Sequence, residues 1–431
     1  MTTPTAPPRV IGLAGAVLIN LNAVIGAGIF ALPALLYAGV GGIAPLVVLA
    51  YAAVVVPRLL ITAKLSTLFD ESGGPQLYAE RAFGPFTGFQ VGFALLGGNM
   101  ASRAANFHVL VSYLAAIFPL FDAPAVRLAT IVALVVLFTA LSLIGTRKSI
   151  EAIWVGTGLK LGPILLVCAA GLIVNGVPAT VTLPEFSGLE SIALLLAYAY
   201  SGAVASTIAA GEVRDARRTV YRSILLNLAV IALFYTLVQW AYIAIDPQVV
   251  NADRPLASAG EAVFGPWGAT LIGVAAVFSI GTNQMTYFVA MPRLLLGMSN
   301  RRLLPAYLGR ISGRFLTPAY AIATYGAIVA LLAISGTFKT LATLMVAMES
   351  LLTLIVVIAL PVLWRKGMVA ARGVRLGGWA LLVAAATAFQ IWLVLQVQAD
   401  AARSTLIAVL IATGFYFLAH RKARREAAMA G

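Results

Sequence analysis

Three ionisable side chains, Arg103, Lys160 and Glu349, stand within long apolar stretches of the sequence. A charge withdrawn from water is stable only where it is paired or hydrogen-bonded, so such residues are candidates for binding ligands or moving ions. Burial also favours the neutral form of a lysine, which makes Lys160 a candidate proton-coupling or cation site. The alternative is a fixed ammonium group that bridges two helices.

Arg103 and Glu349 have two explanations. We predict that they form a buried charge pair, because either charge alone inside a membrane is costly. The alternative is that Arg103 meets an anionic part of a ligand. Arg58 lies nearer the end of its apolar run, and we expect its side chain to extend toward the membrane surface.

Glycine residues interrupt two of the apolar runs, and such interruptions would expose backbone polar groups that can bind a ligand. Gly26 and Gly28 stand one residue apart in the first apolar run, and Gly202 follows Ser201 in the middle of a later run. Each glycine weakens a helix by about 1 kcal/mol. At a broken helix, free N–H groups suit a carboxylate and free carbonyl groups suit an ammonium, so a break suits a zwitterion. Close packing of small residues is the alternative explanation.

The composition indicates a membrane protein. The chain has 431 residues, of which 61% are hydrophobic and 10% charged, whereas soluble domains carry about 25% charged residues. The lipid bilayer is therefore the expected solvent for much of the surface. The net charge of +14 comes from basic residues in short loops. This pattern indicates membrane topology rather than nucleic-acid binding.

Sequence motifs argue against several enzyme classes. There is no HExxH pair, no P-loop, and no dinucleotide fingerprint after a strand. The single cysteine, Cys168, excludes an internal disulfide and a cysteine metal cage. We therefore expect no enzyme activity, no cofactor and no metal, with Cys168 as a buried apolar side chain.

Twelve apolar runs are long enough to cross a bilayer, for which a helix needs about 20 residues. They lie near residues 10–37, 43–67, 85–118, 125–144, 150–175, 189–211, 218–244, 264–298, 317–335, 339–364, 377–397 and 402–420. The two interruptions fall in the first and sixth runs, which is the spacing of a five-helix inverted repeat. This spacing favours a shared binding site over packing alone.

Basic residues are distributed unevenly between the two sets of loops. Of the 29 Lys and Arg residues, only Arg127, Arg254, Lys339 and Arg403 belong to the set that would face outward. The positive-inside rule therefore predicts that both termini are cytoplasmic, in a multi-pass protein of the cell inner (plasma) membrane. The N-terminal tail has no basic region or cleavage site of a secretory signal, so the first span is expected to be retained.

Several segments resemble the amino acid–polyamine–organocation superfamily of permeases. Residues 24–30 (VIGAGIF) are similar to the family's first helix, and residues 72–85 (SGGPQLYAERAFGP) to its cytoplasmic signature. Residues 200–202 (YSG) and 211–214 (GEVR) are similar to elements around its sixth helix, and residues 303–305 (LLP) to a stretch after its eighth. The segments occur in the family's order, and the resemblance extends over nearly the whole chain.

The resemblance implies an all-α membrane protein with a LeuT-like fold and twelve transmembrane helices, of which helices 1 and 6 are broken. The implied parts of the single domain are a tail (1–9), a first repeat (10–175), a second repeat (189–364), two further helices (377–420) and a second tail (421–431). It also implies that backbone around the breaks holds an amino acid. The residues concerned are Ile25, Gly26, Ala27, Gly28, Ile29, Tyr198, Ala199, Tyr200, Ser201 and Gly202.

The resemblance places Arg103 at the pocket and Lys160 near the first break, where related sodium-coupled transporters bind a cation. Aromatic side chains can gate such a site, and Tyr287 is a candidate for this role. Val204 stands where arginine/agmatine antiporters have a glutamate. A neutral amino acid is therefore the preferred substrate, carried by proton symport or exchange. An amine or polyamine transporter or an amino-acid exporter of the same fold remains an alternative, as does a channel or a non-transporting receptor.

Overall fold

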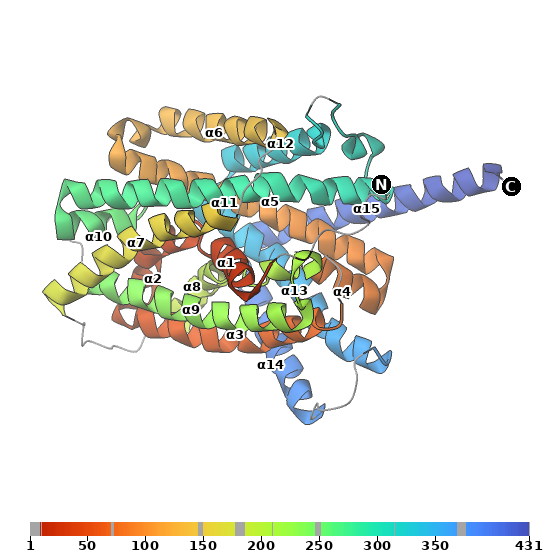
Figure 1. The fold of residues 1–431 in the computed structure, drawn as a ribbon, viewed down its shortest axis with the longest axis horizontal. Helices are drawn as coiled ribbons and strands as arrows, with labels where there is room; N and C mark the ends of the chain where they lie inside the picture. The colour runs from red at the N-terminus through yellow and green to blue at the C-terminus, as the bar shows by residue number, and fades with distance from the viewer. Residues whose placement is uncertain are drawn as a thin grey trace.

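The computed structural model describes residues 9, 11–69, 73–144, 150–176, 186–208, 210–245, 251–313, 315–368 and 376–430. These residues form helices, and their only strand-like pairing is an isolated parallel bridge between Ile11 and Val213 (Figure 1). Ser72 of the signature and most of the N-terminal tail lie outside the described residues.

The described residues up to 176 form seven α-helices. They are α1 (Leu13–Val24), α2 (Gly28–Val40), α3 (Ala44–Ser66), α4 (Gly74–Phe83), α5 (Pro85–Ile117), α6 (Pro124–Ile144) and α7 (Ile150–Asn175). The predicted first span is thus two helices, and the predicted third span is the 33-residue helix α5.

Eight α-helices follow in the described part of the chain. They are α8 (Phe186–Ala199), α9 (Ala216–Ile245), α10 (Pro255–Phe264), α11 (Pro266–Asn300), α12 (Ala319–Ser335), α13 (Phe338–Arg365), α14 (Leu376–Leu395) and α15 (Ala399–Ala430). Short 3-10 turns include η3 (Ala205–Thr207) and η4 (Ala210–Glu212), which follow α8 where the predicted sixth span continues.

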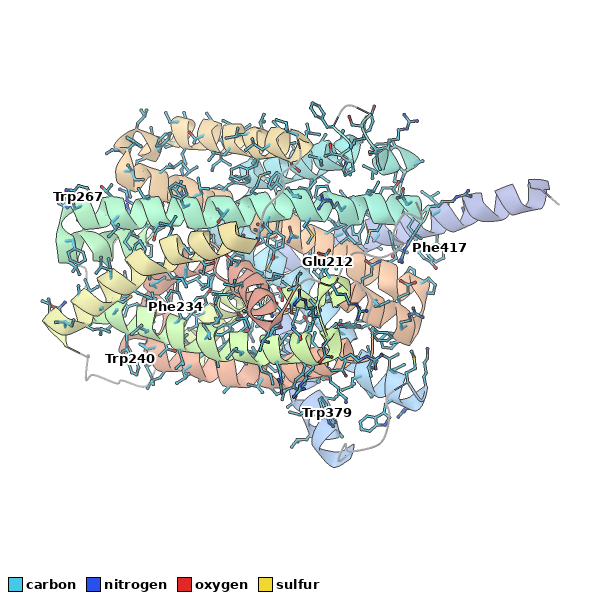
Figure 2. All side chains as sticks on the ribbon, in the orientation of Figure 1. Glu212, Phe234, Trp240, Trp267, Trp379 and Phe417 are labelled. Atoms are coloured by element: carbon cyan, nitrogen blue, oxygen red, sulfur yellow. The ribbon has the colours of Figure 1, made fainter. Side chains whose placement is uncertain are left out.

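Seven helical segments of the described residues are long and apolar enough to cross a membrane. They are Gly28–Ser66, Pro124–Ile144, Thr157–Asn175, Ala216–Ile245, Phe338–Arg365, Gly378–Leu395 and Ala399–Ala419. Three shorter apolar helices, Leu13–Val24, Gly188–Ala199 and Ala319–Ser335, accompany them. Outward-facing apolar side chains such as Leu233 and the labelled Trp267 suit a lipid environment (Figure 2).

The two longest helices begin in the same way. The ten-residue helix α4 ends at Phe83, and Gly84, with φ of 96°, turns the chain so that Pro85 starts α5. The ten-residue helix α10 ends at Phe264, and Gly265, with φ of 65°, precedes Pro266 at the start of α11. Glycine adopts these left-handed angles without strain, and proline suits a first helical turn, so both positions end one helix and begin another.

α5 is the central helix of the bundle. It packs against α11, α12 and α13, while α3 packs against α9. In Figure 1, α11 runs along the length of the bundle, α6 and α12 lie together along one edge, and the end of α15 projects beyond the body. Cys168 on α7 is buried, as expected. This arrangement encloses the interrupted segments between α5, α9 and α11.

Candidate functional site

The interruption predicted in the first span is confirmed. α1 ends at Val24 and α2 begins at Gly28. Ile25, which follows α1, has φ of −78° and ψ of 80°, so it has left the helical conformation. An interrupted helix leaves the carbonyl groups of its last turn without their usual partners.

Side chains from three other helices donate hydrogen bonds to those carbonyl groups. The amide of Asn283 donates to the carbonyl oxygen of Asn22 at 2.7 Å, and the Tyr235 hydroxyl donates to that of Val24 at 3.3 Å. The Lys160 ammonium donates to the carbonyl oxygen of Ile25 at 3.1 Å and to the side-chain oxygen of Asn22 at 2.8 Å. Lys160 is 1% exposed. The predicted position of Lys160 beside the first break is confirmed.

The second interruption follows α8, which ends at Ala199. Residues 200–204 form turns, and Gly202 has φ of 86°, a conformation that side chains disfavour. A Cβ atom on Gly202 would lie 2.8 Å from the carbonyl oxygen of Ala23. The sequence therefore needs glycine here for two reasons, its backbone angle and its close approach to α1.

Backbone polar groups near this second interruption are unpaired. Within the described part of the chain, the N–H groups of Gly202, Ala203 and Val204 have no hydrogen-bond acceptor, whereas the next N–H, that of Ala205, donates to the carbonyl oxygen of Gly202 at 3.0 Å. The carbonyl oxygen of Ala23 likewise accepts no hydrogen bond among these residues. At least three donors and one acceptor of the described residues thus have no partner within the protein.

These groups border a cavity of about 120 Å³. Its walls come from α1, α3, α4, α5, α11, α13 and the turns after α8. The lining includes Ala23, Arg58, Asn99, Ser102, Arg103, Tyr200, Ser201, Gly202, Ala203, Val204, Tyr287 and Glu349. The cavity therefore combines free backbone groups with charged side chains inside a helical bundle.

Arg103 is held on one wall of this cavity by neutral groups. Its terminal nitrogens donate to the side-chain oxygen of Asn283 and, at 3.0 Å, to the Ser102 hydroxyl. Its guanidinium carbon lies 4.1 Å from the ring centroid of Tyr287, a cation–π contact. Arg103 is 4% exposed, and its Nε has no hydrogen-bond partner.

The predicted pairing of Arg103 with Glu349 is wrong. Glu349 on α13 instead faces Arg58 on α3, with 3.7 Å between a terminal nitrogen and a carboxylate oxygen. The Arg58 side chain, 12% exposed, does not extend to the surface as expected. The sequence places Glu349 in a helix, but the side of that helix that faces an arginine depends on how α13 packs between α3 and α5.

The cavity contains five of the predicted substrate-binding residues: Arg103, Tyr200, Ser201, Gly202 and Tyr287. The others lie outside its lining, namely Ile25, Gly26, Ala27, Gly28, Ile29, Tyr198 and Ala199. The Tyr198 hydroxyl donates to the side-chain oxygen of Asn106 at 2.5 Å, and its ring meets Phe338 edge-on. The Tyr198 side chain therefore takes part in contacts between helices and does not line the cavity.

Sequence reasoning missed Ala23, Ala203 and Val204, which carry unpaired backbone groups at the cavity. Their side chains are small and apolar and carry no chemical signal. The available signal was position, because each stands within three residues of a predicted interruption. Asn283, which contacts both Arg103 and the first break, was also missed.

A helical bundle with broken helices around a cavity that contains charged side chains and free backbone groups is typical of membrane transporters. Residues 11–419 match the model of the amino acid permease family, and the chain belongs to this family. It is therefore a multi-pass membrane transporter of amino acids or related amines rather than an enzyme.

Relatives of the chain include transporters from two bacterial groups. Proteins named as uncharacterized transporters in Mycobacterium tuberculosis and Mycobacterium bovis are 30% identical over 345 residues, 77% of this chain and 75% of theirs. The cadaverine/lysine antiporter of Escherichia coli is 27% identical over 268 residues, 60% of each chain.

Proposed function

We propose that this permease is a secondary transporter that binds an amino acid in the cavity beside the second interruption and moves it by alternating access. The observation that carries this proposal is the set of unpaired backbone groups at the cavity. The N–H groups of Gly202, Ala203 and Val204 match a substrate carboxylate, and the carbonyl group of Ala23 matches its ammonium.

A LeuT-like arrangement of twelve spans in two inverted repeats is part of the proposal. The shared start of α5 and α11 supports it, because residues 80–85 (ERAFGP) and 261–266 (EAVFGP) stand at equivalent positions of the two proposed repeats. Each interruption lies in the first span of one of these proposed repeats. The uneven distribution of basic loop residues supports cytoplasmic termini in the inner (plasma) membrane.

Lys160 is our candidate for coupling transport to protons. Its ammonium donates to the side-chain oxygen of Asn22 and to the carbonyl oxygen of Ile25. A change of its charge would therefore alter the hydrogen bonds that hold the end of α1. This arrangement suits proton symport. It also suits exchange, in which Lys160 stays protonated and acts as a fixed bridge.

The charges at the cavity disfavour cationic substrates. The lining includes two arginines, Arg58 and Arg103, and one carboxylate, Glu349, which is already paired. A cationic side chain would meet like charge without a free carboxylate. The Escherichia coli relative is named for cadaverine and lysine. We propose that this permease instead takes amino acids without a positive side chain, neutral ones among them.

Uptake into proteoliposomes tests the proposal. Purified protein is supplied with labelled neutral, acidic and basic amino acids and with cadaverine, with and without an inward proton gradient. We expect saturable uptake of at least one amino acid and none of lysine or cadaverine. Preferred uptake of cadaverine would favour the amine-transporter alternative. Absence of uptake, counterflow and ligand-induced stabilisation across the panel would overturn the proposal in favour of a receptor or a channel.

A further inference from the structure

The side chains that line the cavity carry two positive charges, on Arg58 and Arg103, and one negative charge, on Glu349. One positive charge is therefore not neutralised. We infer that Arg103 is a specificity residue for a second carboxylate, so that the preferred substrates are amino acids with an acidic side chain. This inference rests on the proposed function, because it assigns the substrate class of the same cavity. It starts from the partners of Arg103.

Arg103 has no anionic partner in the described structure. An arginine has five N–H donors, and the hydrogen bonds to Asn283 and Ser102 use two of them. Both partners are neutral, and Nε is unpaired although the residue is nine-tenths buried or more. A buried charge without a counter-charge is strongly unfavourable. A carboxylate that enters the cavity would supply both the missing charge and the missing acceptor.

Glu349 cannot fill this role while it pairs with Arg58. Those two side chains line the same cavity and neutralise each other, with 3.7 Å between their charged atoms. The excess positive charge of the lining therefore resides at Arg103. Asn283, Ser102 and the Tyr287 ring hold the guanidinium in place, so it is oriented before any ligand arrives.

The cavity then offers two separate positions for anions and one for a cation. The first anion position is the run of free N–H groups from Gly202 to Val204, and the second is Arg103. The Ala23 carbonyl group accepts an ammonium. An α-amino acid with an acidic side chain has two carboxylates and one ammonium, so it satisfies all three. A neutral amino acid leaves one anion position empty.

Paired substrates of nearly equal size provide the test. Binding of L-aspartate, L-asparagine, L-glutamate and L-glutamine to the purified full-length protein is measured by competition for uptake and by thermal stabilisation. We expect each acidic member to bind about 10- to 100-fold more tightly than its amide, the range of one charge-assisted hydrogen bond. Equal affinity within both pairs, or tighter binding of the amides, would overturn the inference.

Substitution of Arg103 tests whether this residue causes the preference for acidic substrates. We expect Arg103→Gln to abolish the preference for the acidic member of each pair, and Arg103→Lys to retain part of it because the charge remains. Arg127→Gln is the matched control, because Arg127 lies outside the cavity lining and contacts Asp253 and Ser112. A folded Arg103→Gln protein that still prefers aspartate over asparagine would overturn the role of Arg103.

The outcomes separate this inference from the proposed function. Transport of neutral amino acids without any response to acidic ones would refute the inference and leave the proposed function intact. Failure of every amino acid in every assay would refute both. If Arg103→Gln does not fold, the comparison of the paired substrates on the unaltered protein still decides the substrate class, and Arg103→Lys tests the residue.

Discussion

The two interruptions of the bundle differ in how their polar groups are used. At the first, between α1 and α2, side chains of Lys160, Tyr235 and Asn283 occupy three carbonyl groups. At the second, after α8, the N–H groups of Gly202 to Val204 remain free and border the cavity. Three carbonyl groups of the first break are thus used by the protein itself, although the Ala23 carbonyl group and the N–H groups of Ala27, Gly28 and Ile29 have no hydrogen-bond partner among the described residues. At the second break, no side chain of the described residues accepts from the three N–H groups that border the cavity.

This difference separates structural from binding roles within one motif. A buried polar group without a partner costs about 1–3 kcal/mol, so a break whose groups are satisfied by side chains contributes to stability. In the proposed function, the free N–H groups that border the cavity contribute to ligand binding instead. Three substitutions in or beside the breaks test this assignment, and a double-mutant cycle tests a charge pair of the cavity; they are taken from the largest expected effect to the smallest.

Lys160→Met should destabilise the protein most. It removes the donor to the carbonyl oxygen of Ile25 and to the side-chain oxygen of Asn22, and leaves two acceptors unpaired. We expect a loss of about 2–4 kcal/mol in the free energy of unfolding, measured by denaturation in mixed micelles. Lys339→Met, at an exposed lysine, is the control. Equal stability of the two variants would show that the first break does not depend on Lys160.

Gly202→Ala should impair the second break through strain and contact. The alanine would adopt φ of 86° and place its Cβ 2.8 Å from the carbonyl oxygen of Ala23. We expect a cost of about 1–3 kcal/mol together with loss of substrate-induced stabilisation. Gly28→Ala is the matched control in the first break, where the added Cβ would meet Ala199 at an ordinary 3.5 Å. Equal loss of binding in both variants would contradict our distinction between the breaks.

Tyr235→Phe should have a smaller effect. It removes the hydroxyl that donates to the carbonyl oxygen of Val24 at 3.3 Å and keeps the buried ring. We expect a loss of about 1 kcal/mol in the free energy of unfolding, with substrate affinity unchanged. Tyr320→Phe, at an exposed tyrosine, is the control. A large fall in substrate affinity at normal stability would move this part of the first break into the binding site.

The pair of Arg58 and Glu349 should show the smallest effect. Both side chains are partly exposed and their charged atoms are 3.7 Å apart, so we expect a coupling energy of about 1 kcal/mol or less. A double-mutant cycle with Arg58→Gln and Glu349→Gln measures it. A second cycle with Arg103→Gln and Glu349→Gln should give a weaker coupling. A stronger coupling in the second cycle than in the first would support the pairing of Arg103 with Glu349 that the sequence suggested.

The sequence predicted the interruptions because glycine acts locally. Gly26, Gly28 and Gly202 weaken a helix wherever it packs, so their effect can be read without knowing their neighbours. The repeated Phe-Gly-Pro step before α5 and α11 was a local signal of the same kind, and it was overlooked. Helix content, apolar spans and family followed from such local and compositional features.

The partners of the polar groups could not be predicted in this way. Tyr235 meets Val24 across 211 positions of the chain, and Glu349 selects Arg58 rather than Arg103 according to the rotation of α13. Such contacts depend on packing angles that apolar periodicity does not specify. The sequence placed Lys160 beside the first break through family resemblance, whereas Asn283 had no such guide.

One buried amide ties the two interruptions together mechanically. Asn20 on α1 donates to the Ser223 hydroxyl of α9 at 3.3 Å and accepts from the backbone N–H of Ser206 in η3 at 2.7 Å. We infer that these two bonds couple α1, η3 and the start of α9. In the proposed alternating-access cycle the three segments would then move together, and a ligand held at Gly202 would move with α1.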